Sequence, residues 1–356
     1  MGFSCLDKVW ALSSIMIFMR LFRTGFATVG LLAAILAQPT LAKTNHSQSD
    51  TELLPDSLLQ ISETEAFSRY VFLVDKGERL LRVYERNGEK IRKVQEVPTD
   101  IGKMGGNKTK RDDHKTPEGI YFLEQKLSQP DIPFSLYGSL AFTTNYPNVF
   151  DKRENKTGSG IWLHAIPDSV PLTRGSRGCV VVRNDVIKGL SDYIKLRETP
   201  ILIFDQVNYI SKDNHEKRRL ELNSFVESWR QAWENQDLDS YMSFYDQDFK
   251  APGFNFNSWK KHKENLKKKY GYIKVHLSQP YIVQHKEQLV VKTLQRYESD
   301  KHVDYGVKTI YALKDGESFK IIREEWLPFS EQKVAEAIAK DRFTATQASQ
   351  PAAQPN

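Results

Sequence analysis

Residues 176–184 read SRGCVVVRN, which places a cysteine between a glycine turn and an apolar run. Cys179 is one of only two cysteines in the 356-residue chain. The three valines after it predict a short buried strand, because β-branched residues favour extended backbone. Gly175 and Gly178 permit an open turn in which backbone N–H groups face a bound oxyanion. The stretch therefore predicts a thiol presented at the start of a strand.

The first 42 residues have the features of an export signal. Arg20 and Arg23 precede an apolar stretch, GFATVGLLAAILA, of the length expected for a signal. Thr40 and Ala42 lie where small residues mark a cleavage site. An uncleaved N-terminal anchor is the alternative. Both interpretations export the rest of the chain, so we predict a periplasmic or cell-envelope location.

Export makes the single remaining thiol informative. Cys5 lies in the signal, so the mature chain has only Cys179 and no internal disulfide. A lone thiol in an oxidising compartment indicates a reactive site, whereas a buried, inert cysteine is the structural alternative.

Composition and charge limit the classes of partner. With 40% hydrophobic and 27% charged residues the chain reads as folded protein, and its length favours two domains. The net charge of +6 falls to about +4 without residues 1–42, which is too small and dispersed to predict nucleic-acid binding. The histidines show no ligand spacing, so we predict no metal site.

Residues 65–206 have the pattern of one β-rich domain. Short apolar runs from Arg69 onward are separated by Lys76-Gly77 and Asn87-Gly88, which predicts an antiparallel meander. A helix with Asp185 as its N-cap is predicted over 185–196. Further strands are expected at GIYFLE, SLAFTTN, GIWLHAI, CVVV and PILIFD.

The segments beside this domain are polar. Residues 43–64 include LLPDSLL, which predicts a short amphipathic helix that packs on the body of the protein or on a partner subunit in a homodimer. Residues 207–219 are polar and charged and are predicted to be a linker or the start of a helix. Residues 331–356, rich in Ala, Gln and Pro towards the end, are predicted to be a largely disordered tail.

Residues 220–330 predict a second, α+β domain. Apolar residues at three- and four-residue spacing from Leu222 to Trp233 indicate a helix, a second helix carries Tyr241, and strand candidates follow. Trp229 and Trp233 are expected in the core. The basic run over 260–269 is interpreted as a solvated helix face, with contact to an anionic glycan or lipid head group as the alternative.

A histidine precedes the cysteine by fifteen positions. His164 ends the predicted strand GIWLHAI, and a histidine can serve as base toward a thiol, whose thiolate is the stronger nucleophile. Arg177 and Arg183 are expected to lower the thiol pKa and to bind a substrate carboxylate. Ser176 either donates a hydrogen bond to an oxyanion or caps a turn.

Three stretches together resemble a known family. KTPEG at 115–119, WLHA at 162–165 and SRGCVVVRN at 176–184 are similar to the L,D-transpeptidase (YkuD-type) catalytic domain of bacterial cell-wall enzymes, over residues 69–205. The resemblance implies that a cysteine attacks the amide between the L centre of the third residue of a peptidoglycan peptide stem and D-Ala. An acyl-enzyme forms, D-Ala leaves, and no cofactor takes part.

The resemblance also implies roles by position. Cys179 matches the nucleophile and His164 the catalytic histidine, while the backbone carbonyl of Ala165 would orient the ring. Asn184 falls where the family often has asparagine, and Gly178 belongs to the turn that approaches the substrate.

Two positions depart from the family pattern. Arg177 replaces the usual histidine two residues before the cysteine, and Val181 replaces the arginine two residues after it. Because a guanidinium stays protonated, Arg177 cannot act as a base. The second half-reaction is therefore open between transfer to an amine, as in a transpeptidase, and hydrolysis, as in an L,D-carboxypeptidase.

The second domain resembles another fold. SWRQAWENQDLDSYMSFY and DYGVKTIYALKDGESFKIIREEW are similar to the cone-shaped nuclear-transport-factor-2-like fold, over about residues 220–327. That fold hosts enzymes and plain binding pockets alike, so it implies no second activity. The sequence thus predicts an α+β protein, a β-rich L,D-transpeptidase-type domain followed by a curved sheet with helices. A non-catalytic wall-binding protein is the alternative function.

Overall fold

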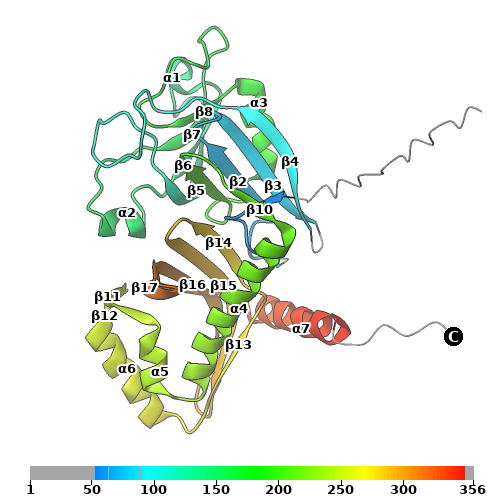
Figure 1. Ribbon diagram of the computed structural model, residues 1–356, viewed down its shortest axis with the longest axis vertical. Helices are drawn as coiled ribbons and strands as arrows, with labels where there is room; N and C mark the ends of the chain where they lie inside the picture. The colour runs from blue at the N-terminus through cyan, green and yellow to red at the C-terminus, as the bar shows by residue number, and fades with distance from the viewer. Residues whose placement is uncertain (1–52, 63, 88–89, 349–356) are drawn as a thin grey trace, which may run out of the picture. The chain divides into compact units, whose positions relative to one another are not determined.

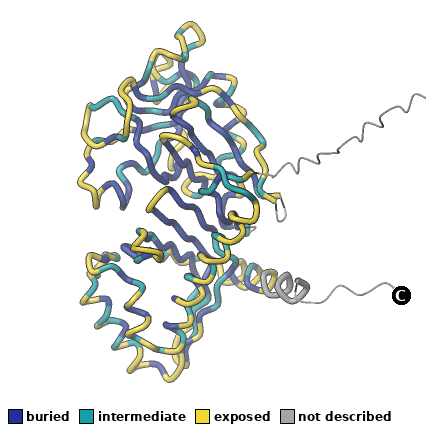
Figure 2. Tube along the Cα trace, viewed as in Figure 1, coloured by how far each residue is buried: buried dark blue, intermediate teal, exposed yellow. Residues whose placement is uncertain are grey.

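The computed structural model describes residues 53–62, 64–87 and 90–348, and it contains two large sheets (Figure 1). The predicted export signal and residues 43–52 lie outside the described residues. The described residues belong to one compact unit. Buried residues concentrate in the strands of both sheets (Figure 2).

The N-terminal domain is built on an eight-stranded sheet with the order β4-β3-β2-β9-β5-β6-β7-β8. The expected meander is present, because β2, β3 and β4 pair antiparallel in sequence order. The strands are β2 (Tyr70–Asp75), β3 (Leu80–Asn87), β4 (Lys90–Pro98), β5 (Gly119–Ser128), β6 (Leu140–Thr144), β7 (Trp162–Ala165), β8 (Val180–Val182) and β9 (Pro200–Phe204).

Short helices complete this domain: α1 (Phe134–Tyr137), α2 (Val149–Arg153), α3 (Asn184–Leu190) and the 3₁₀ turn η1 (Ser191–Tyr193). Asn148 caps α2, since its side chain accepts hydrogen bonds from two backbone N–H groups of the first turn. The predicted cap of α3 was wrong by two positions, because Arg183 is the N-cap and Asp185 lies in the first turn. A carboxylate there still favours the positive end of the helix.

The C-terminal domain is a strongly curved sheet with helices on one face (Figure 1). Its strands are β11 (Tyr245–Ala251), β12 (Phe254–Asn255), β13 (Ile273–Leu277), β14 (Tyr281–His285), β15 (Gln288–Ser299), β16 (Val303–Asp315) and β17 (Ser318–Pro328). The covering helices are α4 (Lys212–Glu234), α5 (Leu238–Ser243) and α6 (Phe256–Lys269). Trp229 and Trp233 pack in the core beneath these helices, as predicted.

The other face of this sheet shares a core with the N-terminal domain. Tyr281, Val290 and Ile322 belong to the same buried cluster as Phe122 and Phe204. Both domains are therefore α+β and strand-rich, as the sequence predicts, and they are joined by apolar packing as well as by the chain.

The predicted helix within 43–64 was wrong for the part that is described. Leu53–Pro55 form β1, which pairs with β10 (Tyr209–Ser211). Leu58 and Leu59 are fully buried in two different cores.

Of the two interpretations of residues 207–219, the linker was wrong and the start of a helix is confirmed. Residues 209–219 form β10 and the first turns of α4, and the Ser211 hydroxyl accepts a hydrogen bond from Asn214 N. Ser, Asp and Asn are typical of helix N-termini as well as of linkers, so composition does not separate the two. The structure does, because β10 pairs with β1 and α4 follows directly.

The predicted disorder was wrong for residues 331–348. They form α7 (Glu331–Ala348), which contacts β15 and β16. Val334 is fully buried and Ile338 nearly so, an apolar pair at four-residue spacing that the Ala- and Gln-rich composition obscures. Residues 349–356 lie outside the described part of the chain.

Candidate active site

Cys179 and His164 come from the ends of two adjacent parallel strands. In the register of β7 and β8, Leu163 pairs with Val180 and His164 with Val181. Cys179, directly before β8, therefore lies level with Trp162. Because side chains two positions apart share a face of a sheet, the thiol and the imidazole emerge on the same side.

The His164 ring is held by the next residue. Its Nδ1 lies 2.6 Å from the carbonyl oxygen of Ala165, and Tyr137 packs edge-on against the ring at 5.1 Å between centroids. A carbonyl oxygen only accepts hydrogen bonds, so Nδ1 carries the proton and Nε2 keeps its lone pair. Burial lowers the His164 pKa to about 4, the hydrogen bond to Ala165 opposes that shift, and the charge of Arg174 adds to it. The ring is therefore neutral at pH 7.

The Cys179 thiol is neutral at rest. Its Sγ donates to the carbonyl oxygen of Gly160 at 3.5 Å. Although the residue is partly exposed, desolvation raises the thiol pKa to about 11, opposed by a backbone hydrogen bond from Trp162 and by the charge of Lys108. The expectation that Arg177 and Arg183 lower this pKa was wrong, because neither guanidinium is among the groups that shift it.

The loop before Cys179 is fixed by a second loop. Backbone hydrogen bonds of 2.8 Å run both ways between Asp100 and Val181. The carboxylate of Asp100 also accepts from Gly175 N at 2.6 Å and forms an ion pair with Arg79. Since Asp100 is almost completely buried, these bonds hold the loop where water competes little.

A tight turn leads into the thiol. The Ser176 hydroxyl donates to the Cys179 carbonyl oxygen at 2.7 Å and accepts from Gly178 N at 3.0 Å, so it caps the turn. Gly178 has φ of 125°, and a Cβ there would lie 2.6 Å from the carbonyl oxygen of Lys115. Only glycine fits this close approach. The stretch KTPEG thus forms the wall behind the turn.

Both domains of this chain are similar to known families and solved structures. The model of the L,D-transpeptidase catalytic domain matches residues 69–203, and that of the Cds6 C-terminal NTF2-like domain matches 221–325. The structure of Bd1075 from Bdellovibrio bacteriovorus is 79% identical, covers 79% of this chain and 100% of its own, and gives a TM-score of 0.74. The chain belongs to the L,D-transpeptidase family.

A more distant member shares both domains. Pgp2 of Campylobacter jejuni, described as a helical cell shape determining protein, is 27% identical over 76% of this chain and 96% of its own, with a TM-score of 0.60. No curated protein matches the chain.

In this L,D-transpeptidase-family protein, two of the predicted substrate-binding residues instead hold loops. The Arg183 guanidinium donates to the carbonyl oxygen of Val170 at 2.7 Å. Asn184 is buried, accepts from Ser139 N at 2.8 Å and donates to the carbonyl oxygen of Ile166 at 2.8 Å. Both side chains use backbone partners, so they shape the site. Arg177 is exposed, with its charge available to a ligand.

Four residues near the pair were given no role in the sequence analysis. Tyr137 contacts Trp162, with ring centroids 4.8 Å apart, and also packs against the His164 ring. Lys108 is buried in an ion pair with Asp113, and its charge reaches the thiol, as that of Arg174 reaches the imidazole. Strand alternation alone would have placed Trp162 on the same face as His164. Tyr137, Lys108 and Arg174 lie outside β7 and β8, so no strand pattern places them near the pair.

Within the described part of the chain, no cluster of three or more His, Cys, Asp or Glu side chains could hold a metal ion. None of the helices described is long and apolar enough to cross a membrane.

Proposed function

We propose that this protein is an exported cysteine enzyme that forms an acyl-enzyme on the peptide stems of peptidoglycan. The observation that carries the proposal is the placement of a thiol and a neutral imidazole on one face of β7 and β8, with Nε2 of His164 left as an acceptor. The family supplies the substrate class.

The first half-reaction follows from these protonation states. Nε2 of His164 takes the proton of Cys179 Sγ as the sulfur attacks the carbonyl carbon at the L centre of stem residue three. The imidazolium then gives the proton to the departing amine, the C–N bond breaks, and D-Ala leaves a thioester on Cys179. The hydrogen bond to Ala165 keeps the ring oriented through both transfers.

The second half-reaction returns the enzyme. In the transpeptidase branch an amine acceptor attacks the thioester and a cross-link or attachment forms. Hydrolysis by water, which trims tetrapeptides to tripeptides, is the alternative. Arg177 favours hydrolysis, since an exposed guanidinium replaces the family histidine that would otherwise offer a second base near the acceptor.

Location and biological role extend the proposal. An N-terminal signal would deliver the enzyme to the periplasm or cell envelope, where its substrate is found. Since Pgp2 is described as determining helical cell shape, we extend the proposal to a role in cell shape through stem trimming. The homodimer predicted through the N-terminal segment stays a prediction, and Leu58 and Leu59 of that segment are buried in this chain's own cores.

One assay separates the candidate activities. Purified mature protein is incubated with disaccharide tetrapeptide under reducing conditions, and the products are identified by mass spectrometry. Cross-linked dimer indicates transfer, tripeptide with free D-Ala indicates hydrolysis, and Cys179→Ser should give neither. Unchanged tetrapeptide with the wild-type protein would refute both catalytic proposals and favour the wall-binding alternative.

A further inference from the structure

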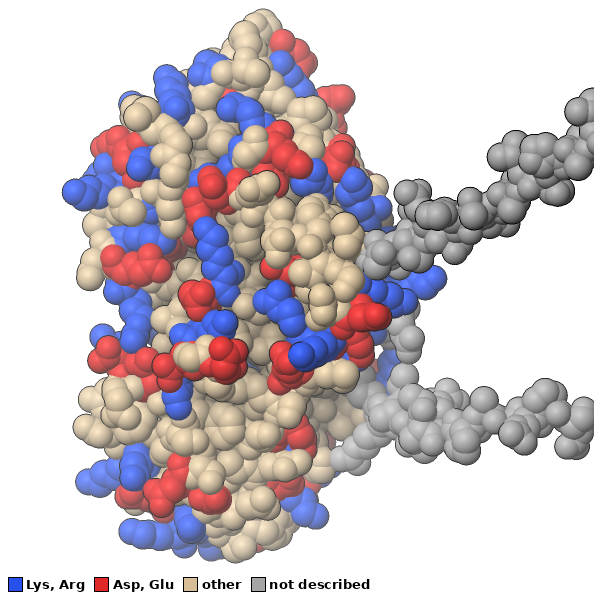
Figure 3. Space-filling view, in the orientation of Figure 1, with Lys and Arg blue, Asp and Glu red and all other residues tan. Residues whose placement is uncertain are grey.

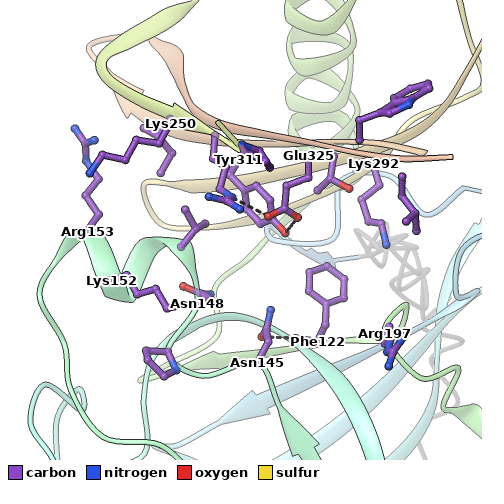
Figure 4. Close-up of a pocket in the computed structure, with 18 of the residues that line it drawn as sticks. Phe122, Asn145, Asn148, Lys152, Arg153, Arg197, Lys250, Lys292, Tyr311 and Glu325 are labelled. Carbon is purple, nitrogen blue, oxygen red and sulfur yellow. Dashed lines mark hydrogen bonds and ion pairs between the residues drawn. The ribbon is translucent and has the colours of Figure 1, made fainter. Parts of the chain in front are cut away.

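A large pocket lies where the N-terminal domain faces the C-terminal sheet. Its volume is about 1060 Å³, and it is lined by α2, β5 and the segment after β6 on one side and by β11, β16 and β17 on the other (Figure 4). Val307 and Ile322 of its lining belong to the core shared by the domains, not to the core under α4–α6. The pocket is therefore on the sheet face that these helices leave free.

Ion pairs between the domains hold the walls of the pocket. Arg153 on α2 lies 3.0 Å from the carboxylate of Asp246, and Lys292 on β15 pairs with Glu198. Outside the lining, a third pair of 2.8 Å between Lys286 and the buried Glu118 also links the two domains. Because these ion pairs already order the walls, a ligand would not have to order them on binding, which lowers the free-energy cost of binding.

The lining carries uncompensated positive charge. Its carboxylates Glu198, Asp248 and Glu325 are each paired with a basic side chain of the same lining. Three further cations of the lining, Lys152, Arg197 and Lys250, have no ion pair with any described residue. Only one lining carboxylate, that of Glu124, is likewise without an ion pair among the described residues. Unpaired cations in a concave site concentrate positive potential there.

The positive charge of the lining is local to the pocket. Acidic and basic side chains alternate on the face shown in Figure 3, so no broad field of one sign dominates it. In Figure 4, Arg153 and Lys250 lie at one side of the pocket and Arg197 and Lys292 at the other, with Phe122 and Tyr311 between them. The matching ligand is extended, with carboxylates at separate points and apolar surface between them.

We propose that this pocket binds a second peptidoglycan peptide stem, one that is not being cleaved, together with its amino sugars. The proposal rests on the proposed function for the substrate class. A stem carries several carboxylates along an extended chain, and sugar rings offer apolar faces to aromatic side chains such as Trp326. The enzyme would thereby hold the wall at one stem while Cys179 acts on another.

The test locates binding by hydrogen–deuterium exchange mass spectrometry. The mature Cys179→Ala protein, which cannot turn over, is titrated with disaccharide tripeptide. We expect protection of peptides covering 145–153 and 307–327, apart from any protection of 160–180 around the thiol. The Lys152→Glu/Lys250→Glu variant should weaken the pocket protection about tenfold or more, because each charge-assisted hydrogen bond lost costs up to about a decade in affinity.

A matched control and a competing ligand sharpen the result. Lys217→Glu changes an exposed cation on α4 outside the lining and should leave the pocket titration unchanged. Triglutamate has similar charge but no sugar and should bind at least about tenfold more weakly. Equal affinity for triglutamate, or equal weakening by Lys217→Glu, would overturn the proposal.

Failure of this proposal is distinguishable from failure of the proposed function. Protection confined to 160–180, or no protection at all, would overturn the second-stem site. Turnover of disaccharide tetrapeptide by the wild-type protein is measured separately and tests the catalytic proposal alone.

Discussion

Nδ1 of His164 lies 2.6 Å from the carbonyl oxygen of Ala165, and this contact determines which ring nitrogen can take a proton. With Nδ1 committed as a donor, a neutral ring has its lone pair on Nε2. Burial keeps the ring neutral at pH 7, because it lowers the His164 pKa to about 4. The pair therefore rests as thiol and imidazole, and the proton moves only when the sulfur attacks.

Slow alkylation is the first consequence. With its pKa raised to about 11, Cys179 should hold roughly a hundredfold less thiolate at pH 7 than an ordinary cysteine and react that much more slowly with iodoacetamide. Protein produced without residues 1–42 has one cysteine, so the same protein unfolded in urea is the matched control. A folded rate equal to or above the unfolded rate would show that the thiol is activated at rest.

Acid should destabilise the fold through His164. Its folded pKa of about 4 is below the unfolded value near 6.5, so the unfolded chain binds more protons between these pH values and stability is lost as pH falls. The loss reaches about 3 kcal/mol by pH 4. His285, also buried with a pKa of about 4, adds a similar loss. Urea denaturation of His164→Asn should therefore show a smaller acid loss than wild type; identical losses would contradict the assignment.

Gly178 should be essential and Gly189 replaceable. An alanine Cβ at 178 meets the Lys115 carbonyl oxygen at 2.6 Å, so Gly178→Ala must displace the turn before Cys179 and lower kcat/KM by about a hundredfold. Gly189 in α3 has open space around its Cα, so Gly189→Ala should raise helix stability by up to about 1 kcal/mol without affecting turnover. Steady-state kinetics and thermal melts distinguish the two. Full activity of Gly178→Ala would show that the turn adapts.

Lys263 should make the free energy of unfolding depend on pH above about 7. The basic run on α6 is mostly exposed, as predicted, but Lys263 is buried with its Nζ 4.0 Å from the Trp233 ring. Desolvation lowers its pKa to about 7, which the charge of Glu324 opposes and that of Lys308 reinforces. The unfolded chain thus binds more protons between about pH 7 and 10.5, and stability rises with pH across that window.

Replacing Lys263 tests this directly. Lys263→Met should be more stable than wild type at pH 7, by ~1–4 kcal/mol, and should lose the rise toward pH 10. Lys261→Met, at an exposed position of the same helix, is the control. Parallel stability curves for wild type and Lys263→Met in chemical denaturation would mean that the lysine stays charged in the fold.

Helix α7 should contribute to stability. Because Val334 and Ile338 fill the shared core, the double change Val334→Ala/Ile338→Ala should cost about 3–5 kcal/mol and lower Tm by several degrees. Lys333→Ala on the exposed side should change stability by less than about 0.5 kcal/mol. Equal melting temperatures for both variants would restore the interpretation of this segment as a disordered tail.

The sequence alone predicted both fold types, which the structure has, and proposed the pairing of Cys179 with His164. These rest on local signals: alternation in the strands, three- and four-residue spacing in α4, and motifs of a few residues around the thiol. Trp229 and Trp233 were placed in the core for the same reason. Local periodicity reports which side of an element is apolar, so it predicts elements and their buried faces.

Only the tertiary structure decided what each polar group does. Arg183 and Asn184 lie beside the thiol in sequence, yet backbone carbonyls and an N–H from distant loops engage their side chains. Lys263 sits in a basic run, yet aromatic rings from α4 and its own helix enclose it. A pKa depends on the desolvation and charge that long-range packing brings to a group, and no pattern of neighbours along the chain contains that information.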